Sequence, residues 1–344
     1  MHEAAGAFAS TLDAYSAAVR DAMATYVAGV EPSRFLYEPI RASTLGPGKC
    51  LRPALCIAAC EAFGGSQADA MASAVAVELL HAAFLIHDDI EDGSLRRRGR
   101  SALHVELGTA IALNTGDALA VLAQRPLLDN VGRLGSRIAR CVLTEFQVAM
   151  ERTVEGQAVE LGWRHDQVTD ITPGDYLDMI LHKTCAYTTI LPLRVGALIG
   201  AWGDADALAM TRFAFALGAA FQIRDDVLDL VSGDATYGKN VLGDIWEGKR
   251  TLALIHLLGT ASENDRADVV AFLERPAGDR SGAGAHRIRD LMGRYGSVAF
   301  AADFGTRMAG EAVDAFDDAF STCPPSPALD FLRGIVPFMI DRAA

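Results

Sequence analysis

Two apolar stretches of this sequence each end in three aspartates at the same spacing. The stretches read ELLHAAFLIHDDIED and FQIRDDVLDL, and their aspartates are Asp88, Asp89 and Asp92 in the first and Asp225, Asp226 and Asp229 in the second. Apolar residues at helical spacing predict that both stretches are helices, so the first and third aspartate of each lie on one helix face. Carboxylates one turn apart repel each other unless a cation lies between them. The repetition therefore favours two helices that face each other across a shared cation site.

Cationic residues follow both aspartate clusters. Arg96, Arg97 and Arg98 come directly after the first, and Lys239 and Lys249 come after the second. Mg²⁺ prefers oxygen ligands and commonly joins protein carboxylates to a substrate phosphate, while guanidinium and ammonium groups bind phosphate oxygens. A solvated helix end would explain one such cluster alone, but two matched clusters favour a magnesium and diphosphate site.

Composition limits the fold and the partners. The 344 residues are 51% hydrophobic and only 7% aromatic, with 12 prolines, which favours helix over sheet and allows one large core. We therefore expect an all-α fold with a single domain over residues 1–344 and its motifs between about 46 and 258. The formal charge of −13 argues against a nucleic-acid partner.

The cysteines and the apolar stretches indicate the cellular compartment of the protein. Six cysteines occur without a CxxC pair and without a preceding secretory signal, so we expect reduced thiols and a cytoplasmic location. The longest apolar stretches, around 71–86 and 188–202, are interrupted by charged or polar residues. We therefore expect no transmembrane segment.

Other polar residues are candidates for the same site. Lys49 and Arg52 follow a GPG turn at the start of a predicted helix, where they could bind an anion or simply cap the helix. His81 lies two turns before Asp88. It is either a ligand in the site or a core residue whose hydrogen bonds are satisfied within the protein. Lys183 lies in an apolar stretch, where an ammonium is costly unless it meets an anion.

Two further stretches have a structural interpretation. Glu155 and Glu160 fit a solvated helix surface, although Gln157 between them could face the site. The stretch 262–285 is polar and rich in Gly, Asp and Arg, so it is the weakest candidate for ordered structure.

The motifs, taken in order, resemble those of the trans-type isoprenyl diphosphate synthases, which are head-to-tail prenyltransferases with an all-helical fold. They are GKCLRP, ELLHAAFLIHDDIED, RRRG with His104, the KT of HKTCAYTT, FQIRDDVLD and GKNVLGDIWEGKRTL. Each motif alone is weak evidence, but the ordered set is specific. The resemblance implies a helical bundle of the isoprenoid synthase type, with the two aspartate-rich helices facing each other across a central cavity, and a homodimer.

The resemblance also implies roles for individual residues. Asp88, Asp92 and Asp225 would be the direct ligands of Mg²⁺, about three ions per site, with Asp89, Asp226 and Asp229 beside them and Arg97 and Lys183 as further catalytic residues. The residues implied to hold the isopentenyl diphosphate head group are Lys49, Arg52, His81 and Arg98. Those implied to hold the allylic diphosphate (dimethylallyl, geranyl or farnesyl) are Arg97, Lys183, Thr184, Gln222, Lys239 and Lys249.

The sequence departs from the family pattern at two places. Cys50 stands where a basic residue is usual, which could weaken isopentenyl diphosphate binding. The loop after Lys239 reads NVLGD, from Asn240 to Asp244, where a Pro and an earlier Gly are common, and this bears on loop closure.

The expected reaction is ionisation of the allylic diphosphate followed by attack of the isopentenyl double bond on the allylic cation. Ala83 and Phe84, beside the first aspartates, favour a geranylgeranyl product, with farnesyl next, unless Phe84 merely packs in the core. A class I terpene cyclase and a non-catalytic regulatory subunit are the alternatives. The low aromatic content argues against the first, and two complete aspartate clusters argue against the second.

Overall fold

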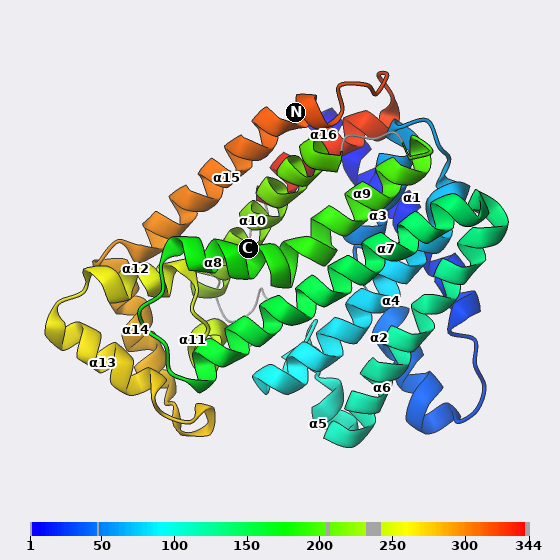
Figure 1. Cartoon of the computed structure of the whole chain (residues 1–344). Coiled ribbons are helices and arrows are strands. Elements are labelled where there is room, and N and C mark those ends of the chain that lie inside the picture. Colours follow the sequence, from blue (N-terminus) through cyan, green and yellow to red (C-terminus); the bar gives the residue numbers. More distant parts are fainter. Residues whose placement is uncertain (1, 47, 204–206, 232–241, 341–344) are drawn as a thin grey trace.

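Helices form nearly all of the computed structural model, which describes residues 2–46, 48–203, 207–231 and 242–340 (Figure 1). The elements of the N-terminal half are α1 (His2–Tyr26), η1 (Ser33–Tyr37), α2 (Glu38–Thr44), α3 (Leu51–Ala62), α4 (Gln67–Asp92), β1 (Arg96–Arg97), β2 (Arg100–Ser101), α5 (Leu103–Leu107), α6 (Thr109–Leu122) and α7 (Gln124–His165). Those that follow are α8 (Pro173–Ile180), η2 (Leu181–Ile190), α9 (Leu191–Gly200), α10 (Ala207–Val231), α11 (Gly243–Glu247), α12 (Leu252–Thr260), α13 (Glu263–Leu273), η3 (Ala277–Asp279), α14 (Gly282–Arg294), α15 (Ser297–Ala319) and α16 (Pro327–Ile340). Among the described residues, the β1–β2 hairpin is the only sheet. The predicted all-α fold is confirmed.

Helix α4 carries the first aspartate cluster and lies inside the bundle. Ser66 caps its N-terminus in a capping box with Asp69, and Gly93, at φ 65°, ends it directly after Asp92. Its faces pack against α3, α6 and α7. By length and composition α4 is the one described helix that could cross a membrane, but 72% of its apolar window is buried inside this fold.

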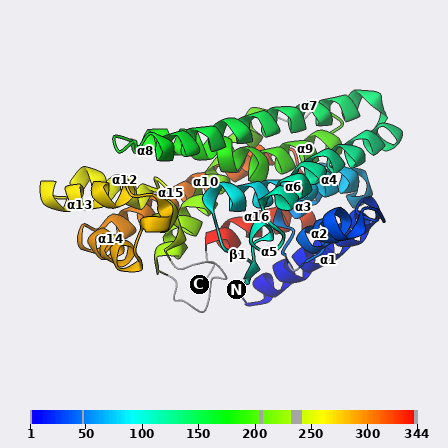
Figure 2. The ribbon, with the colours of Figure 1, turned by 90° about the horizontal axis from the view of Figure 1, so that it is seen from below.

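Two clusters of buried apolar side chains hold the bundle together. The larger joins α1, α3, α4, α6, α7 and α9 to α10, α15 and α16. The smaller joins α8, η2 and α10 to the helices from α11 to α15. Helix α10, which carries the second aspartate cluster, contributes to both clusters and packs along α15. In Figure 2 the long helix α7 lies along one side of the bundle, and α1 and α2 lie along the opposite side.

The segment that carries Lys183 is wound as a π-helix, η2, between α8 and α9. Pro192 lies at the second residue of α9, and the helix continues through it from η2, because Ile190 and Leu191 have helical backbone angles and the N–H of Leu191 donates to Ala186 O. Helix α7 approaches η2 closely at Gly156, because a Cβ there would lie 2.2 Å from the backbone nitrogen of Lys183. Only glycine permits this contact, which fixes α7 against the backbone of the predicted catalytic lysine.

The stretch 262–285, the weakest candidate for ordered structure by its composition, forms α13, η3 and the start of α14. Ser262 caps α13 and Ser281 caps α14, each by accepting a backbone N–H three residues later. Buried Val269, Phe272 and Ala285 anchor the two helices in the smaller core. Composition suggested a loop, but serine caps and a few apolar anchors are sufficient for short helices in a tertiary context.

Candidate active site

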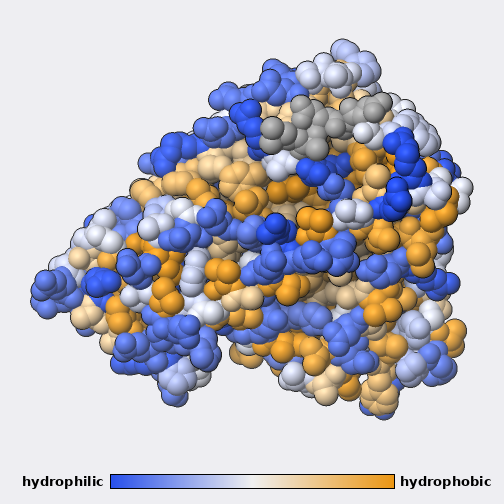
Figure 3. All heavy atoms as spheres, viewed as in Figure 1, coloured by the Kyte–Doolittle hydropathy of each residue, from blue (hydrophilic) through white to orange (hydrophobic). Residues whose placement is uncertain are grey.

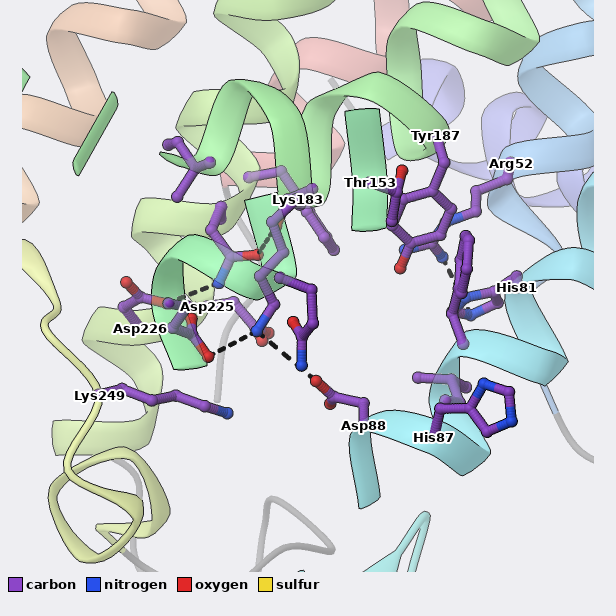
Figure 4. Close-up of a pocket in the computed structure, with 18 of the residues that line it drawn as sticks. Arg52, His81, His87, Asp88, Thr153, Lys183, Tyr187, Asp225, Asp226 and Lys249 are labelled. Carbon is purple, nitrogen blue, oxygen red and sulfur yellow. Dashed lines mark hydrogen bonds and ion pairs between the residues drawn. The ribbon is translucent and has the colours of Figure 1, made fainter. Parts of the chain in front are cut away.

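A cavity of about 770 Å³ lies between the two aspartate-bearing helices. Its lining comes from α3, α4, the β1–β2 hairpin, α7, α8, η2, α10, α11 and the connector before α12. Asp88 of α4 and Asp225 of α10 both line it. Figure 4 shows Asp88 on one side and Asp225 and Asp226 on the other, with Lys183 between them. The two aspartate-bearing helices therefore face one cavity.

Cationic side chains hold the first aspartate cluster. Arg97, from the hairpin, donates from Nε to Asp89 Oδ1 at 2.8 Å, and its Nη2 lies 3.4 Å from Asp88 Oδ2. Lys183 Nζ lies 3.6 Å from Asp88 Oδ1. Both contacts of Asp88 are longer than a usual charge-assisted hydrogen bond, so its carboxylate can still accept a further cation.

Asp92 is bound much more tightly. Its side chain is 1% exposed and lies 2.7 Å from Lys249 Nζ and 2.5 Å from Arg164 Nη1. Burial alone would raise the pKa of Asp92, but Lys249, Lys183 and Arg164 outweigh it and hold that pKa below its usual range. Asp92 is therefore a carboxylate shared by two cations.

In the second aspartate cluster, Asp226 and Asp229 accept hydrogen bonds from neutral donors. Tyr176 and Gln222 each donate to Asp226 at 2.7 Å, while Asp229 accepts the backbone N–H groups of Gly243 and Asp244 at 3.2 and 3.1 Å. Burial, with the charge of Asp244 next, raises the pKa of Asp226 well above its usual range. Asp226 and Asp229 thus support α10 and α11, and Asp225 lines the cavity beside them.

Lys183 meets the anion that its apolar surroundings require. Its ammonium lies 2.7 Å from Oε1 of Glu160, a residue of α7 that is 5% exposed. The next residue, Thr184, donates to Gln222 at 3.1 Å. The expectation of an anionic partner for Lys183 is confirmed, whereas the assignment of Glu160 to a solvated surface was wrong.

A second polar region lies at the other end of the cavity, around Arg52. Arg52 Nη1 lies 3.1 Å from His81 Nε2, Nη2 donates to Thr188 Oγ1 at 3.0 Å, and the guanidinium lies 4.8 Å from the centre of the Tyr187 ring (Figure 4). Burial, helped by the charges of Arg52 and Arg98, holds the pKa of His81 well below its usual range. His81 is therefore a neutral, buried ring.

Lys49, Cys50 and Arg98 also line this end. Lys49 Nζ lies 5.0 Å from the centre of the Phe338 ring, and Arg98 packs against Gly48. Lys49 precedes α3 instead of lying on its first turn, because Cys50 has left-handed backbone angles and the helix begins at Leu51. Burial raises the pKa of the Cys50 thiol to about 12, so this residue supplies no negative charge to the site.

Most of the described candidates line the cavity, but Asp89, Asp92, Asp229 and Ala83 do not. Phe84 lines it and packs edge-on against Tyr187 at 5.2 Å between ring centres, whereas Ala83 is buried outside the lining. Lys239 and part of the NVLGD loop lie outside the described residues. The sequence offered no signal for Arg164, Tyr176 or Tyr187, because their positions depend on how separate helices pack.

The donor set fits a divalent cation only in part. Within the described part of the chain, no three Asp, Glu, His or Cys side chains lie close enough together to hold a metal ion. Asp88 and Asp225 nevertheless offer the oxygen ligands that Mg²⁺ prefers to the same cavity. Direct ligation by Asp92 stays a prediction, and it would require release from Lys249 and Arg164.

Comparisons with known proteins found relatives that match nearly the whole chain. The short chain isoprenyl diphosphate synthase of Methanothermobacter thermautotrophicus is 32% identical over 335 residues, 95% of this chain and 96% of that protein. A geranylgeranyl diphosphate synthase of Sulfolobus acidocaldarius is 32% identical over 317 residues, 91% of this chain and 93% of that protein.

Among solved structures, the geranylgeranyl pyrophosphate synthetase of Pyrococcus horikoshii superposes with a TM-score of 0.84 at 30% identity, and the match covers 98% of this chain and 99% of that one. The family model described as polyprenyl synthetase matches residues 33–284. The protein therefore belongs to the polyprenyl synthetase family.

Proposed function

We propose that this protein is a prenyltransferase that joins isopentenyl diphosphate head-to-tail to an allylic diphosphate and releases geranylgeranyl diphosphate. The observation that carries the proposal is the pairing of two separate cationic regions in one cavity. One is centred on Arg52 and the other on Lys183 and Lys249. Two regions suit two diphosphates, and the geranylgeranyl-forming relatives support the choice of product.

The region around Lys183 suits the allylic diphosphate. Lys183 and Lys249 place ammonium groups beside Asp88 and Asp92, where they can meet the negative charge that grows as the allylic C–O bond breaks. Mg²⁺, for which Asp88 and Asp225 supply oxygen ligands, would neutralise further charge on the departing diphosphate when it is bound.

The region around Arg52 suits the isopentenyl head group. Arg52 offers its planar fork to phosphate oxygens, and the neutral His81 ring fixes one edge of that fork at 3.1 Å. Tyr187 and Thr188 fix the opposite edge. Arg52 is therefore oriented before substrate arrives, which lowers the entropic cost of binding.

Part of the cavity lining is apolar. Phe84, Leu85, Met179 and Phe221 contribute to it. An allylic cation reacts with any water that it meets, so these side chains protect it until the isopentenyl double bond attacks. The departing diphosphate can accept the proton that the new product loses, so none of these apolar residues needs to act as a base.

We also propose a homodimer. Exposed apolar side chains follow the outer faces of α6 and α7, and Figure 3 shows orange apolar residues interspersed with polar ones on this side of the molecule. They are Leu113, Val121, Leu128, Val131, Leu143 and Val148. A second copy of the chain would cover them. The cysteine pattern supports a cytoplasmic location, which cell fractionation would test.

The decisive experiment is incubation with Mg²⁺, isopentenyl diphosphate and each allylic primer in turn, followed by chromatography of the products. We expect geranylgeranyl diphosphate as the longest main product. A cyclised hydrocarbon formed from one substrate would indicate a terpene cyclase. Absence of turnover with every primer would indicate a non-catalytic subunit and contradict the proposal.

A further inference from the structure

Lys249 reaches the site from a short connector and not from a helix. Its ammonium lies 2.7 Å from Asp92 and 2.7 Å from Glu247, and Figure 4 shows it extending across the pocket. The connector has few residues, because α11 ends at Glu247 and α12 begins at Leu252. The direction of Lys249 therefore depends on what holds the backbone of this connector.

Arg280 holds one side of the connector. It lies between η3 and α14, in the stretch whose composition suggested a loop, and it is only 7% exposed. Its Nη1 donates to the carbonyl oxygen of Trp246 at 2.5 Å. Nη2 and Nε donate to Leu273 O and Arg275 O at 2.8 and 3.1 Å, at the C-terminal end of α13. One guanidinium thus ties α11 to the end of α13.

The same guanidinium packs against the residue that precedes Lys249. A Cβ at Gly248 would lie 2.7 Å from Arg280 Nη1, so the guanidinium fills the space of a side chain there. Gly248 also has φ 74°, which favours glycine. From the other side, Arg250 donates to the carbonyl oxygen of Gly248 and, at 3.0 Å, to that of Val168. The backbone before Lys249 is therefore held from both sides.

Main-chain carbonyls accept all the hydrogen bonds of Arg280, and its ring contact is with Phe272, 5.8 Å from the guanidinium. A buried guanidinium without a carboxylate partner is costly. Three aligned carbonyls offset that cost only while α11 and α13 keep their relative position. Arg280 therefore fixes the position of α11 relative to α13.

We propose that Arg280 is a positioning residue for the allylic diphosphate site, acting through Lys249. The inference rests on the proposed function for the identity of the ligand. It extends the site to α13, η3 and α14, beyond the region that carries the recognisable motifs.

Binding of inorganic diphosphate with Mg²⁺, measured by isothermal titration calorimetry, tests this without requiring turnover. Arg280→Met should weaken diphosphate binding about tenfold, whereas Arg275→Met, an exposed arginine five residues earlier, should leave it unchanged. In a Lys249→Ala background, Arg280→Met should change the dissociation constant by less than about twofold, because coupled residues are not additive. Additive losses, or unchanged binding in Arg280→Met, would overturn the proposal.

Two controls keep the test decisive. Arg280→Lys retains the charge and part of the hydrogen bonding. If circular dichroism shows that Arg280→Met does not fold, Arg280→Lys replaces it in the same comparison, with an intermediate loss of diphosphate affinity expected. Steady-state assays of the same variants should show a raised KM for the allylic substrate and an unchanged KM for isopentenyl diphosphate. A wild-type protein that binds diphosphate but transfers no prenyl group would contradict the proposed function and leave the role of Arg280 intact.

Discussion

At the residue scale, the six aspartates have unequal surroundings despite their identical spacing. Asp88 has only long contacts with cations, while Asp92 is enclosed by Lys249 and Arg164. Asp226 accepts hydrogen bonds from neutral donors, and Asp229 accepts them from the backbone of α11. The repeated motif predicts where the carboxylates cluster, but only packing decides which of them remain open to a ligand.

We expect Asp88→Ala and Asp225→Ala to lower kcat by at least about a hundredfold, roughly 3 kcal/mol in barrier, because each removes an oxygen ligand from the cavity. The thermal midpoint should change little, since neither side chain belongs to the apolar core. Asp314→Ala, at an exposed position of α15, is the matched control. Near-normal turnover in both site variants at saturating Mg²⁺ would refute the assignment.

His81 should make folding sensitive to acid. In the folded state the pKa of His81 lies well below its usual value of 6.5. Below about pH 6.5 the unfolded chain therefore binds a proton at His81 that the folded chain does not bind. Stability from this residue is therefore complete above pH 6.5 and falls by up to about 1.4 kcal/mol per pH unit below it. Urea unfolding of wild type and His81→Gln at pH 7 and pH 5 checks this, and equal losses in both would contradict it.

At the element scale, the periodicity of apolar residues predicts where the helices lie but not which helices pack against each other. The apolar repeats of α4 and α10 are local, so the sequence reveals them. Glu160 was misassigned because spacing shows which residues share a helix face, but not which face meets η2. Arg280 was missed for the same reason, since its three acceptors lie on segments that only tertiary packing brings together.

Substitutions at the two ends of the cavity should affect the KM values of different substrates. Arg52→Ala should raise KM for isopentenyl diphosphate more than KM for the allylic primer, because Arg52 lies in the region around His81. Lys183→Ala should do the reverse, because its ammonium lies beside Asp88. Initial rates with one substrate varied at a time give both constants. Equal effects on both substrates would show that the assigned head-group regions are wrong.

Helix α4 should also set product length. One helical turn advances about 5.4 Å, roughly one isoprene unit, and Phe84 lines the cavity one turn before Asp88. Phe84→Ala should lengthen the product, and Ala83→Phe should shorten it if the added ring reaches the cavity wall from its buried position. Product chromatography decides, and an unchanged distribution in both variants would mean that the floor lies elsewhere.

At the scale of the whole molecule, the bundle encloses one cavity with two cationic regions, and the outer face of α7 carries exposed apolar side chains. If that face binds a second copy, Val131→Asp combined with Val148→Asp should convert a dimer to a monomer in sedimentation experiments, because two buried charges would be unpaired. Val313→Asp, at an exposed position of α15, is the control. A dimer that survives the double substitution would exclude this face.

The π-helix η2 contributes to both proposed substrate regions. Lys183 lies beside Asp88 and Thr184 donates to Gln222, while Tyr187 and Thr188 contact Arg52 a few residues later. One continuous backbone therefore links the two regions, although Arg52 lies on α3 and Lys249 on the connector before α12. When warming loosens the contacts between helices, Arg52 and Lys249 should shift relative to η2 first. Affinity for both diphosphates should then fall before η2 itself unwinds.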